Sequence, residues 1–104
     1  MPEGKPTVRV RVGRQWYRAL VDTGADVSLI RATIYNELKK RGLATELTPI
    51  ESTIQGVGGT EIRQFGGTTV SFLVNSQIVS GEFRVVSDIN HSFILGWDWL
   101  TQFT

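Results

Sequence analysis

The chain has 104 residues, of which 40% are hydrophobic and 20% charged, and its formal net charge is +1. This length accommodates one hydrophobic core, so we expect a single domain spanning residues 1–104. The balanced charge argues against a nucleic-acid-binding surface, and we expect no nucleic-acid partner.

Ligands for a metal ion are scarce in this composition. The chain has no cysteine and one histidine, which excludes thiolate and histidine-rich metal sites. No run approaches the roughly 18 apolar residues of a membrane span, and the first residues, MPEGKP, lack the apolar region of a signal peptide. We therefore expect no metal, no other cofactor and no membrane partner, and the chemistry must use carboxylates, hydroxyls or backbone groups.

The N-terminal part of the chain is predicted to form a β-hairpin. The segment TVRVRV (7–12) alternates between apolar and polar residues, as expected of a strand with one buried face. Residues 13–14 give a turn signal, and QWYRALV (15–21) returns as a second strand. This second strand leads directly to Asp22.

One helix is predicted after Asp22. Ile34, Leu38 and either Tyr35 or the apolar part of Arg41 follow helical spacing within residues 31–41, and Gly42 is the expected C-terminal cap. Residues 51–67 then contain two β-prone runs on either side of a glycine-rich tip, which predicts a long hairpin.

The C-terminal third is predicted to contain three strands and a helix. Residues 68–74 and 77–86 read as strands joined by a turn, and the apolar run 93–95 ends at Gly96 before the helical segment WDWLTQF (97–103). Trp16, Trp97 and Trp99 are interpreted as large packing residues.

Asp22, Thr23 and Gly24 form the candidate catalytic motif. Glycine lets the backbone approach a ligand closely, and a threonine hydroxyl beside an acid can join a fixed hydrogen-bond network. An Asp-Thr/Ser-Gly triplet alone occurs by chance in roughly one chain of this size in twenty, so a plain turn residue is the alternative. Its combination, in order, with a glycine-rich hairpin and the run FILG makes the motif specific.

The chain resembles the retropepsins, the proteases of retroviruses and related retroelements, and is most similar to lentiviral members. Residues 5–26 (KPTVRVRVGRQWYRALVDTGAD) are similar to the first third of these proteases, 54–59 (IQGVGG) to their flap tip and 93–103 (FILGWDWLTQF) to their closing strand and helix. The resemblance implies a mainly all-β, retropepsin-like acid protease fold. It would be a closed β-barrel-like monomer with a flap hairpin and one or two short helices, paired as a two-fold homodimer.

The resemblance also implies an aspartic endopeptidase. The chain has a single Asp-Thr-Gly, so two copies must each supply one Asp22. Two carboxylates about 3 Å apart cannot both ionise cheaply and would share one proton. One Asp22 then acts as base on a bound water, while its protonated twin polarises the peptide carbonyl.

Further roles follow from the resemblance. Thr23 would hydrogen-bond across the dimer, the Gly24 carbonyl would hold substrate backbone, Asp26 would bind the peptide near its ends, and Val57 would close over the substrate. Positions that match the subsite walls, together with other substrate contacts, are Leu20, Ala25, Val27, Leu29, Ile54, Gln55, Gly56, Ser92 and Ile94. They predict mainly apolar pockets for an extended peptide or polyprotein, although core packing is the alternative for Leu29 and Ile94.

The chain departs from the family at two places. Trp97 stands where most members have an arginine that pairs with the acid corresponding to Asp26, so Asp26 must meet another partner, such as Lys5, or solvent. Family dimers are commonly tied by a sheet of both termini, whereas only MPEG precedes Lys5 and the chain stops at Thr104. We therefore expect a weak, concentration-dependent homodimer, which a sub-nanomolar dissociation constant would contradict.

Three functions are compatible with these residues. The leading hypothesis is an endopeptidase that processes a viral or retroelement polyprotein, located in the virion or in the host-cell cytoplasm as part of that polyprotein. The second is a catalytically idle retropepsin-like module for dimerisation or peptide binding. The third is a small β-barrel binding module without enzymatic ancestry, which leaves the ordered coincidence of three motifs unexplained.

Overall fold

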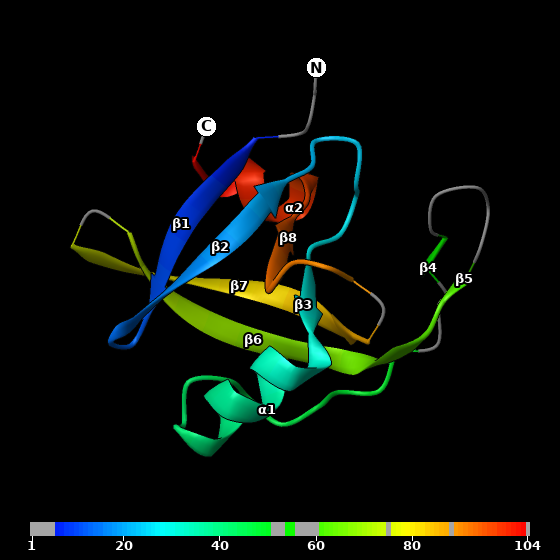
Figure 1. Ribbon diagram of the computed structural model, residues 1–104, viewed down its shortest axis with the longest axis horizontal. Coiled ribbons are helices and arrows are strands. Elements are labelled where there is room, and N and C mark those ends of the chain that lie inside the picture. Colours follow the sequence, from blue (N-terminus) through cyan, green and yellow to red (C-terminus); the bar gives the residue numbers. More distant parts are fainter. Residues whose placement is uncertain (1–5, 51–53, 56–60, 75, 88, 104) are drawn as a thin grey trace.

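The computed structural model describes residues 6–50, 54–55, 61–74, 76–87 and 89–103. Six strands close into a barrel in the order β1-β2-β8-β3-β7-β6, and β4 and β5 pair with each other outside it (Figure 1). The elements are β1 Thr7–Val12, β2 Gln15–Val21, β3 Leu29–Arg31, α1 Ala32–Lys40, β4 Ile54–Gln55, β5 Glu61–Ile62, β6 Gln64–Val74, β7 Gln77–Val86, β8 Phe93–Leu95, α2 Trp97–Leu100 and a 3₁₀ helix Thr101–Phe103. The predicted mainly β, barrel-like fold is confirmed.

The N-terminal hairpin forms as predicted. β1 and β2 pair antiparallel from Thr7 opposite Leu20 to Val12 opposite Gln15. Gly13 adopts φ +62° in the tight connection, a conformation that costs glycine little. The alternation places Val10 and Val12 in the core, and it directs the arginines of β1 outward.

β6 begins four residues earlier than the predicted strand. Its pairing with β7 shifts register between Gln64 and Gly66, and Gly66 adopts φ +145°. A Cβ at Gly66 would lie 2.8 Å from the backbone oxygen of Thr48. Gly66 therefore accommodates a bulge and a close approach of the neighbouring segment.

Helix α1 covers one end of the barrel (Figure 1). Leu38 and Tyr35 are its buried residues, and Ile34 is half-buried. Arg41 is exposed, so the open choice between Tyr35 and Arg41 falls to Tyr35. The helix ends before Gly42, which has φ +73°. The Leu43 N–H then donates to the Leu38 carbonyl at 2.8 Å and closes the helix end.

The barrel interior holds an aromatic cluster. Phe72, Phe83 and Phe93 are at most 1% exposed, and their ring centroids lie 5.3–5.5 Å apart in tilted or edge-on pairs. Tyr17 and Trp99 add edge-on contacts to this cluster. Each such pair contributes roughly 0.5–1.5 kcal/mol beyond the burial of its area.

Tyr17 also joins the barrel to α1. Its hydroxyl donates to the carboxylate of Glu37 on the helix. Burial, and then the hydrogen bond to Glu37, raise the pKa of Tyr17 to about 12. The side chain therefore remains a neutral donor throughout the neutral pH range.

The three tryptophans differ in environment. Trp99 is 7% exposed and packs in the core, as predicted. Trp16 and Trp97 are each 54% exposed. The prediction that they pack in the interior of the chain is therefore wrong. The Arg9 guanidinium lies 4.8 Å from the centroid of the Trp16 ring, and this cation–π contact accounts for Trp16 on an outward face.

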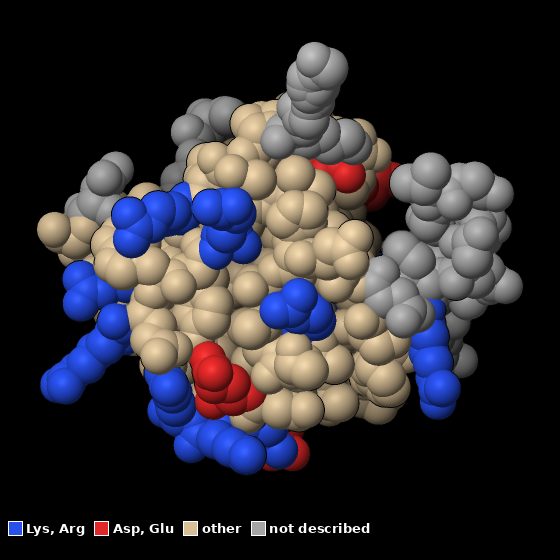
Figure 2. Space-filling view, viewed as in Figure 1, with Lys and Arg blue, Asp and Glu red and all other residues tan. Residues whose placement is uncertain are grey.

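The exposed surface is mixed in charge. Figure 2 shows basic side chains scattered over one face of the molecule, at its periphery and near its middle, with uncharged side chains between them. Among the described residues, no helix has the length and apolar character that crossing a bilayer requires.

Candidate active site

Asp22 lies at the end of β2, at the start of a tight turn. The Asp22 N–H donates to the Leu95 carbonyl at 3.0 Å, and the Asp22 carbonyl accepts from the Ala25 N–H at 3.1 Å. The Gly24 N–H donates to Asp22 Oδ1 at 3.1 Å. Asp22 is half-buried, whereas Thr23 and Gly24 are exposed. The barrel thus presents the carboxylate at its edge on a backbone fixed from both sides.

The support of this turn comes from the C-terminal part of the chain. β2 and β8 run parallel, with Val21 opposite Leu95. The Trp97 N–H donates to the Ala25 carbonyl at 2.8 Å, and the Asp98 N–H approaches the Asp26 carbonyl at 3.4 Å. The first turn of α2 is therefore fastened directly to the turn that carries Asp22.

A buried serine strengthens this junction. Ser28 is 0% exposed. Its hydroxyl donates to Asp98 Oδ1 at 2.7 Å and accepts from the Gly96 N–H at 2.8 Å, and its own N–H donates to Asp98 Oδ2 at 3.3 Å. Bonds to an ionised carboxylate are the stronger kind. Ser28 and Asp98 therefore lock β3 to α2 directly behind the turn.

Sequence reasoning did not identify Ser28 or Asp98. A signal was present, because Ser28 interrupts the apolar run around Leu29 and Ile30, and Asp98 lies between two tryptophans. A polar residue in an apolar run indicates a buried hydrogen bond. The partner, 70 residues away, follows only from the fold.

The sheet brings three predicted subsite residues side by side. Leu20 on β2 pairs with Ile94 on β8, and Ile94 pairs with Leu29 on β3. Leu20 and Ile94 are half-buried, and Leu29 is 6% exposed. Ser92 precedes β8, where its carbonyl accepts from the Arg31 N–H at 3.0 Å.

The remaining predicted residues lie in two other segments. Ala25 and Val27 are half-buried in the segment after Asp22, and Asp26 is exposed. Ile54 and Gln55 form β4, which pairs antiparallel with β5 and gives the two arms of a hairpin. Gly56, Val57 and Lys5 lie outside the described residues.

Comparison with known families decides the identity of this fold and motif. The sequence model described as retroviral aspartyl protease matches residues 2–104. The chain belongs to the retroviral aspartyl protease family. This confirms the resemblance inferred from the Asp-Thr-Gly motif and the C-terminal run.

Solved structures of retroviral-type proteases agree with this assignment. The EIAV protease complexed with the inhibitor HBY-793 is 31% identical, with a TM-score of 0.76 over 96% of this chain and 88% of that chain. The retroviral protease-like domain of Ddi1 from Leishmania major is 16% identical, with a TM-score of 0.70 over 98% of this chain and 75% of that chain. This second similarity is one of fold alone. Comparison with curated protein sequences yields no significant match.

In this member of the retroviral aspartyl protease family, Trp97 contacts the turn that carries Asp22 through its backbone. Its backbone binds Ala25, but its indole is 54% exposed. The carboxylate of Asp26 is exposed, and no side chain in the described ranges is recorded as binding it. The Ser28–Asp98 pair supplies a side-chain link between the segment that follows Asp22 and α2.

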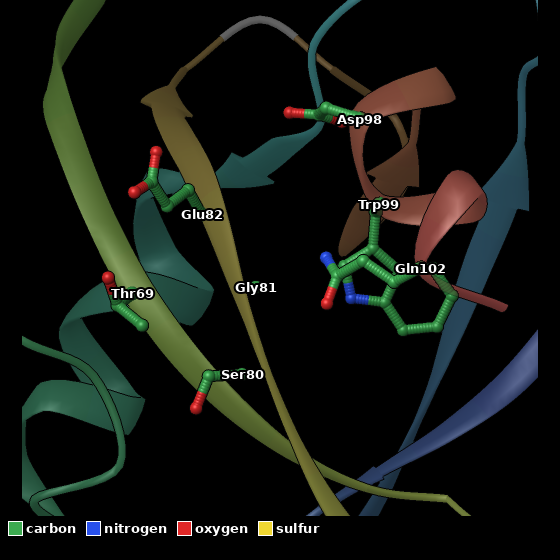
Figure 3. A pocket seen from close by; sticks show the side chains of 7 residues that line it. All are labelled: Thr69, Ser80, Gly81, Glu82, Asp98, Trp99 and Gln102. Atoms are coloured by element: carbon green, nitrogen blue, oxygen red, sulfur yellow. The ribbon is translucent and has the colours of Figure 1, made fainter.

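A separate cavity of about 360 Å³ lies between the β6–β7 sheet and α2. Figure 3 shows Thr69, Ser80 and Glu82 on the strand side, and Trp99 and Gln102 on the helical side. None of the predicted protease-site residues lines this cavity. In the described part of the chain, no group of three or more His, Cys, Asp or Glu residues could hold a metal ion.

Replacing Ser28 with alanine is expected to destabilise the fold by about 2–3 kcal/mol. The change leaves the Gly96 N–H and Asp98 Oδ1 without the hydroxyl that joins them in the interior. Urea denaturation of wild type and variant at equal protein concentration measures the difference.

Ser80→Ala is the matched control, because Ser80 is exposed and its hydroxyl lies 3.5 Å from that of Ser71. The control should change the unfolding free energy by less than about 0.5 kcal/mol. Equal effects of the two alanines would show that the buried hydroxyl does not hold the junction.

Proposed function

We propose that this protein is an aspartic endopeptidase whose active site forms when two copies of the chain meet about a two-fold axis. The observation that best supports this proposal is the turn at the end of β2, which holds one Asp22 carboxylate on a backbone bonded to Leu95. The sequence contains one Asp-Thr-Gly. A pair of carboxylates therefore needs a second copy of the same turn.

Water activation follows from such a pair. Two carboxylates in contact retain one proton between them, because ionising both would place like charges together. The ionised Asp22 removes a proton from the bound water as it attacks the peptide carbonyl. The protonated Asp22 donates a hydrogen bond to the carbonyl oxygen, and a proton then passes to the leaving amine.

The neighbouring residues have positioning roles in this proposal. Thr23 is exposed beside Asp22 and is available to hydrogen-bond across the two-fold axis. Gly24 leaves room at the carboxylate, since a Cβ there would lie 3.4 Å from Asp22 Oδ1. Its exposed backbone suits contact with substrate.

The substrate would be an extended polypeptide. Strand addition binds the peptide backbone and leaves alternate side chains for pockets. Leu20, Leu29 and Ile94 lie on adjacent strands beside the turn and favour apolar side chains. The β4–β5 hairpin would form the flap over the peptide, with Gln55, Gly56 and Val57 as contacts.

The relatives extend this proposal to a biological role. The EIAV protease was solved as a complex with an inhibitor. By family membership, the substrate would be a viral or retroelement polyprotein, processed in the virion or the host-cell cytoplasm.

Peptide cleavage at mildly acidic pH tests the proposal. The purified chain is incubated with a library of extended peptides, with and without pepstatin, and products are identified by mass spectrometry. We expect pepstatin-sensitive cleavage whose rate per chain rises with protein concentration and then levels off. Peptide binding without turnover would support the idle module, and the absence of both would contradict a protease-type site.

A further inference from the structure

Trp97 is a large apolar side chain that the chain itself leaves uncovered. It is 54% exposed. The Trp16 indole, which is equally exposed, is covered in part by the Arg9 guanidinium. Among the described residues, no ring or guanidinium stacks on Trp97. Fold stability within one chain therefore does not account for a tryptophan here.

The backbone fixes Trp97 beside the catalytic turn. Its N–H donates to the Ala25 carbonyl at 2.8 Å, three residues beyond Asp22. It also follows Gly96, whose close packing against the backbone of Val27 leaves little freedom for the start of α2. Trp97 therefore occupies a rigid position on the same end of the barrel as Asp22.

A second exposed apolar side chain lies at that end. β1 begins where β2 and β8 finish, since the Val21 N–H donates to the Pro6 carbonyl and Val21 pairs with Leu95. Val8 is 43% exposed there, although it belongs to the inward-facing series of β1. The end of the barrel that carries Asp22 thus exposes apolar side chains around the half of the active site that one chain would supply.

We propose that Trp97 is an apolar anchor through which two copies of this chain associate. This inference rests on the proposed function, in which the two Asp22 turns must meet. An interface that joins these turns also includes the ends of the strands and helix bonded to them. A rigid, exposed tryptophan within such a surface is the residue type that contributes most to association.

Sedimentation of three variants tests this assignment. The dissociation constant of the homodimer is measured for wild type, Trp97→Ala and Trp16→Ala, and circular dichroism checks that each is folded. The two-fold axis repeats every contact. A loss of about tenfold for each indole therefore gives a rise of about 100-fold for Trp97→Ala. Trp16→Ala, an equally exposed control, should change the constant by less than about threefold.

Tryptophan emission gives an independent measurement. The emission maximum of the wild type and of Trp16→Phe should shift to the blue as the concentration rises through the dissociation constant, because dimerisation buries the Trp97 indole. Trp97→Phe should show no such shift. A wild type that stays monomeric at every concentration would overturn both the proposed function and the anchor. A stable wild-type dimer with equal effects of the two alanines, or with the shift retained in Trp97→Phe, would overturn the anchor alone.

Discussion

Replacing Asp22 with asparagine is expected to lower peptide turnover by about 10³-fold or more, with the dimer retained. An amide cannot remove a proton from water, and the pair loses the charge that makes one member a base. The side chain keeps its size, and asparagine Oδ1 can still accept from the Gly24 N–H. Steady-state cleavage and sedimentation of the same preparation measure the two effects separately.

The same variant tests whether one active site needs an Asp22 from each of two chains. Above the dissociation constant, mixing equal amounts of wild type and Asp22→Asn leaves about half of the original wild-type homodimers, by mass action. If each mixed dimer is inactive, activity should fall to about half. Activity that does not fall, or that rises towards about 1.5 times the original, in a mixture that forms mixed dimers would mean that one Asp22 is sufficient.

Replacing Gly96 with alanine is expected to destabilise the protein by about 3 kcal/mol and to reduce activity further. A Cβ at Gly96 would lie 2.5 Å from the Val27 carbonyl oxygen and 2.8 Å from the Ala25 carbonyl oxygen. Both atoms belong to the backbone after Asp22, so the overlap can be relieved only by shifting this segment and the start of α2 apart. The melting temperature should fall by more than about 10 °C.

Gly42 provides a control for this substitution. A Cβ at Gly42 meets nothing within 4 Å, and the strain comes only from φ +73°. Gly42→Ala should therefore cost about 1 kcal/mol, without a change in activity beyond that from unfolding. Calorimetry at one protein concentration compares the three proteins, and a Gly96→Ala melting temperature within a few degrees of wild type would contradict the predicted clash.

Local patterns were sufficient to predict much of the barrel. Strict alternation located β1, and the predicted bounds of β7 and β8 agree with the structure. In each case the pattern that predicts the strand lies within consecutive residues of the strand itself. The helix was also predicted, because Tyr35 and Leu38 lie on one buried face. The Asp-Thr-Gly motif located the turn at the end of β2, because its three residues are consecutive in the sequence.

Features that depend on distant segments were not predicted. β3 has three residues and exists because β7 and β8 pair with it on either side. The link between Ser28 and Asp98 and the exposure of Trp97 likewise require the barrel to be closed. Alternation cannot report such contacts, because their partners are far away in the chain.

The parallel pairing of β2 with β8 has a consequence for biosynthesis. Residues 19–21 pair with residues 93–95, so the acid-bearing turn lacks the β8 side of its support until nearly the whole domain has left the ribosome. Contacts this distant in sequence form late and slowly. A nascent chain or a fragment truncated before Leu95 would therefore carry the motif without its supporting strand, which delays any cleavage until synthesis of the domain is almost complete.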